Sequence, residues 1–443
     1  MSSIKLSDHF SFGKLIKFTI PSIAMMIFTS IYGVVDGFFI SNFVSESAFT
    51  AVNFIMPFLM ILGAVGFMFG AGGTALVSKT LGEGNKEKAN SLFSLFIYVP
   101  FFLGIVIAII GNIFIENIAI MLGASGEMLE NCIVYGTIIN IGLPFYMLQM
   151  EFQSFMIAAE RPSLSFVFTV IAGCTNIVLD ALFVAIFHFG VVGAAIATIS
   201  SQFVGAVLPF IYFSRKNKSP LKLGKAKFDF KAILTACGNG SSELMSNVSM
   251  SLVGMLYNVQ LLNFAGEHGV AAYGVLMYVN FIFISAFIGY SIGCAPIIGY
   301  NYGANNSDEL KLILKKSLVI IGIASVGMFI ISELLGAPLA KIFVGYNEEL
   351  LALTKRAFLF YSFSFLFSGY AIFGSSFFTA LNNGPISAII SFLRTLVFQV
   401  IAVLILPLIF DVDGIWISII VAEALAVVVT AIFMIAKRKK YNY

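Results

Sequence analysis

The sequence predicts an all-α integral membrane protein with twelve transmembrane helices in two six-helix lobes, related by a pseudo-twofold axis along the membrane normal. Hydrophobic residues make up 59% of the 443 residues and charged residues only 11%, whereas soluble domains carry about 25% charged residues. Apolar stretches long enough to cross a bilayer recur along the whole chain. No soluble interior of this size could bury so much apolar surface, so lipid must cover it.

Windows of about 20 apolar residues define twelve spans. The loops between them are mostly short, which predicts a compact bundle in which sequential helices pack together. The spans are 15–41, 51–78, 92–115, 131–157, 163–187, 191–213, 233–262, 270–299, 311–335, 351–380, 386–409 and 414–436.

The placement of Lys and Arg predicts that both termini are cytoplasmic. In this orientation 21 of the 25 basic residues lie on the cytoplasmic side, three lie on the outer side and Arg394 lies within a span. This asymmetry satisfies the positive-inside rule, and an odd number of spans would break it. The three outer basic residues are Lys341, Lys355 and Arg356.

The longest polar connection lies at the midpoint of the chain and divides it into two lobes. We expect an N-lobe over residues 1–213, a cytoplasmic basic linker over 214–231 and a C-lobe over 232–443. The linker reads SRKNKSPLKLGKAKFDFK. Its charge suits both membrane topogenesis and contact with anionic headgroups, and the sequence does not separate the two.

The two halves resemble each other at offsets of 221 to 223 residues. Gly-rich helix ends followed by Gly/Asn turns occur in GAGGTALVSKTLGEGNKEKANSLFS and GYSIGCAPIIGYNYGANNSDELKLIL. A second pair is QSFMIAAERPSLSF and SFFTALNNGPISAI, each with a Pro at the start of the next helix. Because six spans is an even number, both copies enter the membrane from the same side. A cavity between two such lobes permits alternating access by rocking.

Several polar residues fall in the outer half of the predicted N-lobe. Asp36, Asn176, Asp180 and Thr198 lie in spans 1, 5, 5 and 6, and Tyr135 lies somewhat shallower in span 4. Charged residues at this depth are costly and are usually functional. Two carboxylates in a medium of low dielectric constant cannot both ionise easily, so the pair can exchange a proton or Na⁺. The alternative is a structural cluster joining three helices, at about 1 kcal/mol per hydrogen bond.

The chain resembles the multidrug and toxic compound extrusion (MATE) transporters over nearly its whole length. The resemblance is carried by IPSIAMMIFTSIYGVVDGFFISNFV, ALVSKTLGEGNKEKA, NIVLDALF with FGVVGAAIAT, and SIGCAPIIGYNYGANN. It implies cation-coupled export on a fold shared with lipid-linked oligosaccharide flippases.

The resemblance also implies roles for individual residues. Asp36, Asn176, Asp180 and Thr198 match the N-lobe cation site of the family, so a bound Na⁺ would lie among them. No other metal is expected. Pro21 matches the proline at which the first helix of the family bends.

Four further charged residues lie within predicted spans. Glu243, among small polar residues in span 7, resembles an acid that some MATE branches use to bind cation or substrate. Those branches also carry an Asp in span 10, which is absent here, so a Na⁺ site in the C-lobe is disfavoured. Arg394 and Glu423, on adjacent spans, are expected to form a structural ion pair. Glu151, near the inner end of span 4, either pairs or faces the inner mouth.

The sequence therefore predicts a secondary active multidrug efflux antiporter. It would export organic, cationic and lipophilic compounds in exchange for H⁺ or Na⁺. The 48 Phe and 17 Met suit a cavity for varied ligands. The alternative is a lipid-linked oligosaccharide flippase, whose phosphate-bearing substrate would need several intramembrane Arg or Lys.

We expect no enzyme activity, because no nucleophile or metal-ligand motif stands in a suitable context, and GEGNKEKA lacks the Lys-Ser/Thr of an ATP-binding loop. We also expect no cofactor and no nucleic-acid partner. The protein should be a monomer in the plasma membrane.

Overall fold

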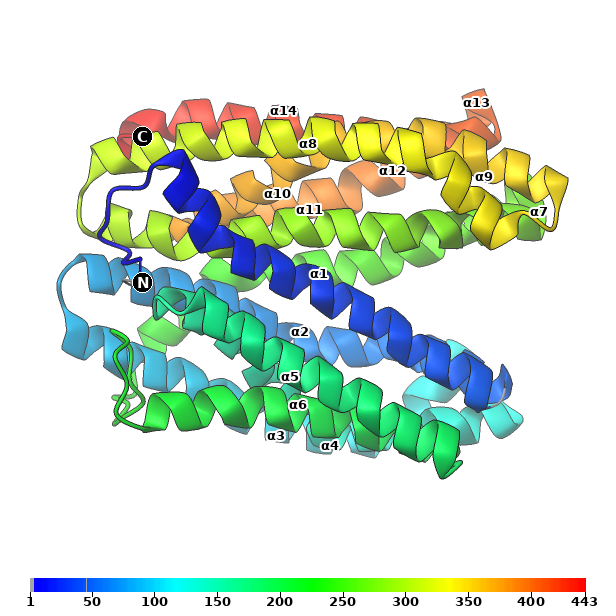
Figure 1. Ribbon diagram of the computed structural model, residues 1–443, viewed down its shortest axis with the longest axis horizontal. Coiled ribbons are helices and arrows are strands. Elements are labelled where there is room, and N and C mark those ends of the chain that lie inside the picture. Colours follow the sequence, from blue (N-terminus) through cyan, green and yellow to red (C-terminus); the bar gives the residue numbers. More distant parts are fainter. Residues whose placement is uncertain (1–3, 45) are drawn as a thin grey trace.

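The computed structural model describes residues 4–44 and 46–443, and every regular element in these residues is helical (Figure 1). The first half contains α1 (Phe12–Phe43), α2 (Glu46–Gly82), α3 (Lys86–Leu122), α4 (Gly126–Ala158), α5 (Pro162–Asp180), the π-helical η1 (Ala181–Ile186) and α6 (Gly190–Ser214). The second half contains α7 (Phe230–Gly303), α8 (Ser307–Val344), α9 (Glu348–Tyr361), η2 (Ser362–Ser364), α10 (Phe365–Ala380), α11 (Gly384–Phe392), η3 (Leu393–Val397), α12 (Phe398–Ile405), α13 (Pro407–Phe410) and α14 (Val412–Tyr441).

The 74-residue α7 is a hairpin of two membrane-spanning arms. Gly266, with φ 58° and ψ −155°, has a conformation that suits glycine and breaks the helix there. The rings of Tyr257 and Tyr273, one on each arm, stack at 5.5 Å. Over the described residues 11 helices are long and apolar enough to cross a membrane, and dividing α7 into its first arm (230–265) and second arm (267–303) gives the predicted twelve spans.

Corresponding turns of the two halves share the same unusual backbone geometry. Positive φ angles occur at Gly84 and Asn305, at Glu160 and Asn382, and at His188 and Asp411, pairs that are 221, 222 and 223 residues apart. These offsets match those that the sequence predicts. They support two six-helix lobes related by an internal repeat, while the exact lobe boundaries stay a prediction.

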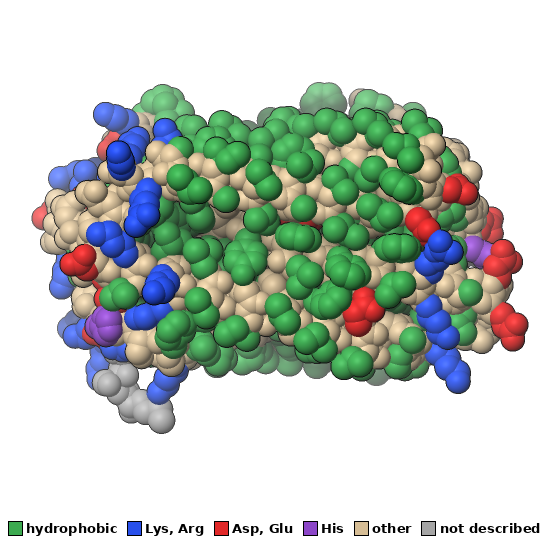
Figure 2. Space-filling view, turned by 90° about the horizontal axis from the view of Figure 1, so that it is seen from above, with side chains coloured by type: hydrophobic (Ala, Val, Ile, Leu, Met, Phe, Trp, Pro, Cys, Tyr) green, Lys and Arg blue, Asp and Glu red, His purple; other side chains and the backbone are tan. Residues whose placement is uncertain are grey.

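Charged side chains gather at the two ends of the helix bundle, separated by a hydrophobic band (Figure 2). Lys and Arg dominate one end, whereas acidic and basic side chains mix at the other. Both chain termini lie at the basic end (Figure 1). We call the two ends the basic end and the opposite end.

The linker between α6 and α7 is held against α3 at the basic end. The backbone N–H of Lys222 donates to Asn90 Oδ1 at 2.7 Å, and that of Gly224 donates to Ser94 Oγ at 3.0 Å. This segment has no regular secondary structure over residues 217–229 apart from bends. Its hydrogen bonds nevertheless fix its course.

The two lobes meet through glycines on α2 and on the first arm of α7. A Cβ added to Gly72 would lie 1.9 Å from the carbonyl oxygen of Ala236, and one added to Gly240 would lie 1.8 Å from that of Met68. No side chain fits at either distance. The two backbones are therefore as close as helices can pack.

The same close packing continues toward the basic end on the second arm of α7. A Cβ on Gly303 would lie 2.0 Å from the carbonyl oxygen of Lys79. Nearer the membrane centre, Ser30 Oγ on α1 lies 2.5 Å from Ser285 Oγ on α7. From there the two groups of ribbons diverge toward the opposite end (Figure 1), so the lobes are joined at the basic end.

Candidate functional site

Four helices of the N-lobe bring the predicted cluster together. Asp36 comes from α1, Tyr135 from α4, Asn176 and Asp180 from α5, and Thr198 from α6. The Asp36 carboxyl faces Asp180, Asn176 and Thr198. The Tyr135 ring is fully buried beside both carboxyls. All five predicted residues thus lie in one place.

The cluster holds buried polar atoms that the protein leaves without a partner. Among the described residues, neither carboxylate oxygen of Asp180 and neither polar atom of the Asn176 amide has a hydrogen-bond partner. Asp180 is 0% exposed and Asn176 is 2% exposed. Buried polar groups are normally satisfied, so the unpaired carboxyl and amide atoms here are free to bind a proton, a water or an ion. Two carboxyls, an amide oxygen and a hydroxyl form an oxygen-rich donor set that suits a proton or a small hard cation.

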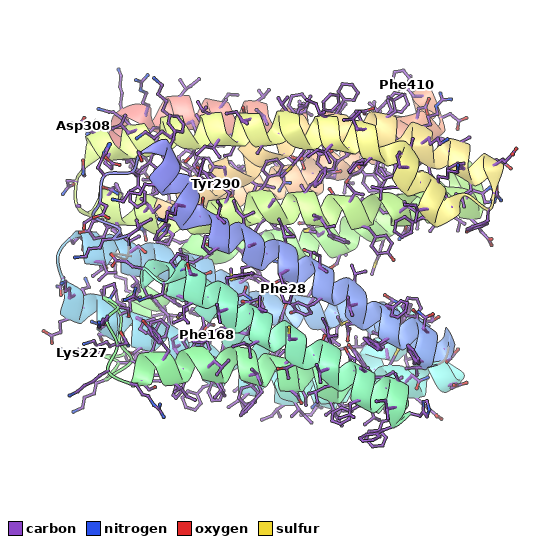
Figure 3. The ribbon with its side chains drawn as sticks, in the orientation of Figure 1. Phe28, Phe168, Lys227, Tyr290, Asp308 and Phe410 are labelled. Atoms are coloured by element: carbon purple, nitrogen blue, oxygen red, sulfur yellow. The ribbon has the colours of Figure 1, made fainter. Side chains whose placement is uncertain are left out.

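Local helix geometry positions Asp180. It ends the α-helical part of its span, and η1 follows directly as a π-helical turn. Such insertions shift the register of a helix and frequently occur at functional sites. Seven residues earlier Gly173 lets α1 approach, because a Cβ there would lie 2.5 Å from the Phe28 ring. Phe28, labelled in Figure 3, lies on α1, which runs alongside α5.

Two tyrosines belong to the surroundings of the cluster although the sequence analysis did not select them. Tyr32 lies one turn before Asp36 on α1 and interacts with its carboxyl. Tyr146 on α4 lies near Tyr32. The i, i+4 spacing of Tyr32 and Asp36 could have identified the first. Nothing in the sequence distinguishes Tyr146 from the other 15 tyrosines.

A cavity of about 370 Å³ lies within the C-lobe, among α7, α10, the span containing η3, and α14. Its wall contains the predicted Glu243 together with Arg394 and Glu423. The charged pair is direct, because Arg394 Nε donates to both oxygens of Glu423 at 3.1 and 2.9 Å. The predicted ion pair is therefore confirmed, and it also lines a cavity.

Aromatic and amide groups complete this cavity, and the sequence analysis missed them. The stacked Tyr257 and Tyr273 form part of the wall. Tyr257 OH donates to Gln399 Oε1 at 2.7 Å. Glu243 remains free of a salt bridge among the described residues, so it is the carboxyl that can meet a ligand.

Two other predicted residues lie away from both sites. Glu151 is 0% exposed, and neither of its oxygens has a hydrogen-bond partner among the described residues. Its backbone packs against Gly70 of α2, so it neither pairs nor faces an open mouth in this conformation. Pro21 lies within α1, which is helical on both sides of it.

The fold and these sites define a twelve-helix membrane transporter with a carboxyl cluster in one lobe and a charged, aromatic cavity in the other. The MatE family model matches residues 21–182 and 244–405, one match in each half. The chain therefore belongs to the MatE family, the multidrug and toxic compound extrusion transporters. This membership confirms the predicted family and the prediction that the protein is a transporter and not an enzyme.

Named relatives and solved structures agree with this assignment. The chain is 27% identical to the multidrug export protein MepA of Staphylococcus haemolyticus over 368 residues, 81% of this chain and 80% of the relative. It is 26% identical to MepA of Staphylococcus aureus over 424 residues, 94% of this chain and 91% of the relative.

Two solved structures of MATE transporters share the fold. One, of MATE in complex with MaL6, has a TM-score of 0.93 at 21% identity and covers 100% of this chain and 99% of that chain. The other is an outward-facing multidrug resistance MATE family transporter of the MOP superfamily, with a TM-score of 0.93 at 22% identity and the same coverage. The predicted fold class is confirmed.

Proposed function

We propose that the protein is a secondary active antiporter that exports organic, cationic and lipophilic compounds in exchange for H⁺ or Na⁺. The observation that carries this proposal is the carboxyl pair of the half-buried Asp36 and the fully buried Asp180, whose surroundings leave carboxylate and amide atoms unpaired. A group of this kind changes its interactions strongly when a cation binds or leaves. The name shared by the MepA relatives, multidrug export protein, supports the same direction of transport.

The coupling ion would be held by the N-lobe cluster. A proton would reside on Asp36 or Asp180. A Na⁺ would be held by oxygens of Asp36, Asn176, Asp180 and Thr198, with Tyr135 closing the site. Because Asp36 alone of these lies on α1, loss or gain of the ion changes the force between α1 and the other N-lobe helices. Pro21 removes one backbone hydrogen bond of α1, so it is the place where that helix bends most easily.

The basic end would face the cytoplasm, as the positive-inside rule requires. The lobes are then joined on the cytoplasmic side and apart on the outer side, which is the arrangement expected of an outward-facing state. Both termini would be cytoplasmic, the membrane would be the plasma membrane and the protein would act as a monomer.

The C-lobe cavity would bind the organic compound. Its wall carries two carboxyls and one guanidinium, and because Arg394 is already paired with Glu423, Glu243 supplies the uncompensated negative charge. Tyr257 and Tyr273 add aromatic surface to which a lipophilic cation can bind. A flippase for phosphate-bearing lipids would need free cations here, and the wall offers only the paired Arg394.

Efflux from proteoliposomes tests the proposal. We would load vesicles with a fluorescent organic cation and impose either a pH gradient or a Na⁺ gradient at fixed membrane potential. Export driven by one of these gradients, and lost in Asp180→Asn, is expected. Export that is unaffected by either gradient would refute the proposed antiport. Translocation of a lipid-linked saccharide without drug export would refute it as well.

A further inference from the structure

A second set of buried polar groups extends from the carboxyl cluster toward the basic end, through the interior of the N-lobe. Three helix faces contribute to it. On α5 the buried polar residues are Ser165, Thr169, Asn176 and Asp180, spaced by 4, 7 and 4 residues, so they share one face. From Ser165 to Asp180 this face covers about 22 Å at 1.5 Å per residue.

Helix α4 contributes two buried amides, Gln149 and Gln153, beside the Ser165 and Thr169 part of this face. Small residues, Ala172 and Gly173, occupy the middle of the α5 face. At the adjoining level Gln149 of α4 packs on Gly205 of α6, where an added Cβ would lie 2.7 Å from Gln149 Cδ. A side chain on Gly205 would displace this amide.

On α6, Gln202 lies in sequence between Thr198 of the cluster and Gly205 beside Gln149. It lies one turn from Thr198 on α6, and its Oε1 is 2.9 Å from the position of a Cβ on Gly142 of α4. Both Gln202 Oε1 and Gln149 Nε2 are buried without a hydrogen-bond partner among the described residues. We call the set Asp180, Asn176, Gln202, Gln149, Gln153, Thr169 and Ser165 the polar file.

A small cavity lies at the end of the polar file that contains Ser165 and Thr169. Its volume is about 10 Å³, and Gln149, Gln153, Thr169 and Ser165 are in its wall. This is about the room that one water needs, and a buried water requires two to four polar partners of the kind present here. Phe168 of α5, labelled in Figure 3, forms an apolar part of the wall.

The polar file stops short of the basic end at a methionine. Ser165 Oγ donates to the carbonyl oxygen of Gln153 at 3.2 Å and also lies 3.2 Å from Met25 Sδ of α1. Met25 is 0% exposed. Ser165 is only three residues from Pro162, the first residue of α5. Bending of α1 would therefore move the residue that closes the file.

We propose that the polar file, with water in its small cavity, conducts protons between the carboxyl cluster and the basic end, and that Met25 closes it in this conformation. Amides, hydroxyls and water both donate and accept hydrogen bonds, so water bound to the unpaired atoms of the file would let a proton enter at one end as another leaves. The proton leaves the Asp180 carboxyl and reaches the basic-end solution. A Na⁺ would need several oxygen ligands at once, and the cavity has room for one water. The inference rests on the proposed antiport and specifies H⁺ as the coupling ion.

Proton flux in proteoliposomes tests the polar file. We would drive export with a substrate gradient and record the internal pH with a trapped dye, while substrate binding is measured separately in detergent. Gln149→Leu and Thr169→Val should lower coupled proton flux by about a hundredfold, the low end of what a positioned proton-transfer group contributes. Substrate binding, which also reports on folding, should stay unchanged. Thr169→Ser, which keeps the hydroxyl, should restore most of the flux.

Thr175→Val is the matched control. Thr175 is on the same helix, off the buried face, and its hydroxyl donates to the carbonyl of Ile171 at 2.8 Å. It should behave as wild type. Wild-type flux in both Gln149→Leu and Thr169→Val would overturn the polar file, as would export in the wild type that moves no protons. Asp180→Asn, measured in parallel, distinguishes failure of the polar file from failure of the proposed antiport. Normal export in that variant refutes the antiport itself.

Discussion

Arg394 and Glu423 form a bifurcated ion pair in the wall of the C-lobe cavity, with the guanidinium Nε 2.9 Å from one carboxylate oxygen and 3.1 Å from the other. Their side chains are 15% and 4% exposed. The pair joins η3 to α14, and η3 is a π-helical turn. A charge pair at this depth fixes two helices relative to each other and compensates the charge of Arg394 in the cavity wall.

Removing one member of this pair should destabilise the protein more than removing both. Arg394→Met or Glu423→Leu alone leaves a buried charge unpaired, at a cost of about 3 kcal/mol, which for a chain of this size lowers Tm by about 3 °C. The double variant should recover most of this loss. Thermal unfolding of the four proteins in one detergent gives the cycle, and additive single effects would contradict a direct pair.

Neutralising either carboxyl of the N-lobe cluster should abolish ion-driven export without preventing membrane insertion. Asp36→Asn and Asp180→Asn keep size and hydrogen-bonding capacity but cannot ionise, so the site can no longer exchange its cation. We expect export to fall by about a hundredfold, with each variant present in the membrane at wild-type level. Glu116→Gln, an exposed acid on α3, is the control. Wild-type transport in either Asp variant would remove the cluster from the coupling mechanism.

Because α2 and α7 pack so closely, an added methyl group at their contact should loosen the junction of the two lobes at the basic end. Gly240→Ala would place its Cβ 1.8 Å from the carbonyl oxygen of Met68, so α2 and the first arm of α7 must separate. Overpacking of this kind costs about 1–3 kcal/mol. The variant should unfold at a lower temperature, and Cys237, a half-buried free cysteine on the first arm of α7, should become more accessible to a membrane-impermeant thiol reagent. Gly238→Ala, with open space around the added Cβ, should change neither measurement.

Hydropathy and charge were sufficient to predict the spans, because the bilayer imposes a length and a sign rule on every helix. The i, i+4 spacing of Asn176 and Asp180 correctly placed them on one face. The helices nevertheless extend beyond the predicted spans: the span predicted at 311–335 is observed as Ser307–Val344. Apolar windows mark the lipid-embedded part of a helix and not its ends.

Other features depend on packing that one sequence does not reveal. Tyr257 and Tyr273 could be recognised as cavity residues only once the α7 hairpin had brought them together. The π-helical turn after Asp180 arises from a slip in backbone hydrogen bonding, and no residue type marks it. The surroundings of a single charged residue are equally hard to predict. The sequence position of Glu151 allowed either pairing or exposure, and the structure shows neither.

Two acids at the basic end should respond to pH in opposite directions. Burial raises the pKa of Glu160 above its ordinary value of 4.5, although the Leu6 N–H donates to its Oε1 at 2.8 Å. The hydrogen bond from Lys14 lowers the pKa of Asp8 below 3.8. A raised carboxyl pKa means that the folded state holds its proton more tightly, so this stabilisation is complete below pH 4.5 and is lost as the pH rises through the folded value. For Asp8 the stabilisation is present above pH 3.8 and is lost as the pH falls.

Glu160→Gln should therefore match wild type in Tm at low pH and exceed it at neutral pH, because the amide keeps an acceptor for the Leu6 N–H without the buried charge. Asp8→Asn should do the reverse, falling below wild type at neutral pH and approaching it in acid. Thermal unfolding between about pH 2 and pH 8, a range that extends below the ordinary pKa of both carboxyls, measures both differences. Because the two residues lie at the same end of the bundle and shift in opposite senses, a general effect of detergent or net charge would move both variants together. Parallel curves would show that neither carboxyl is coupled to folding as its contacts imply.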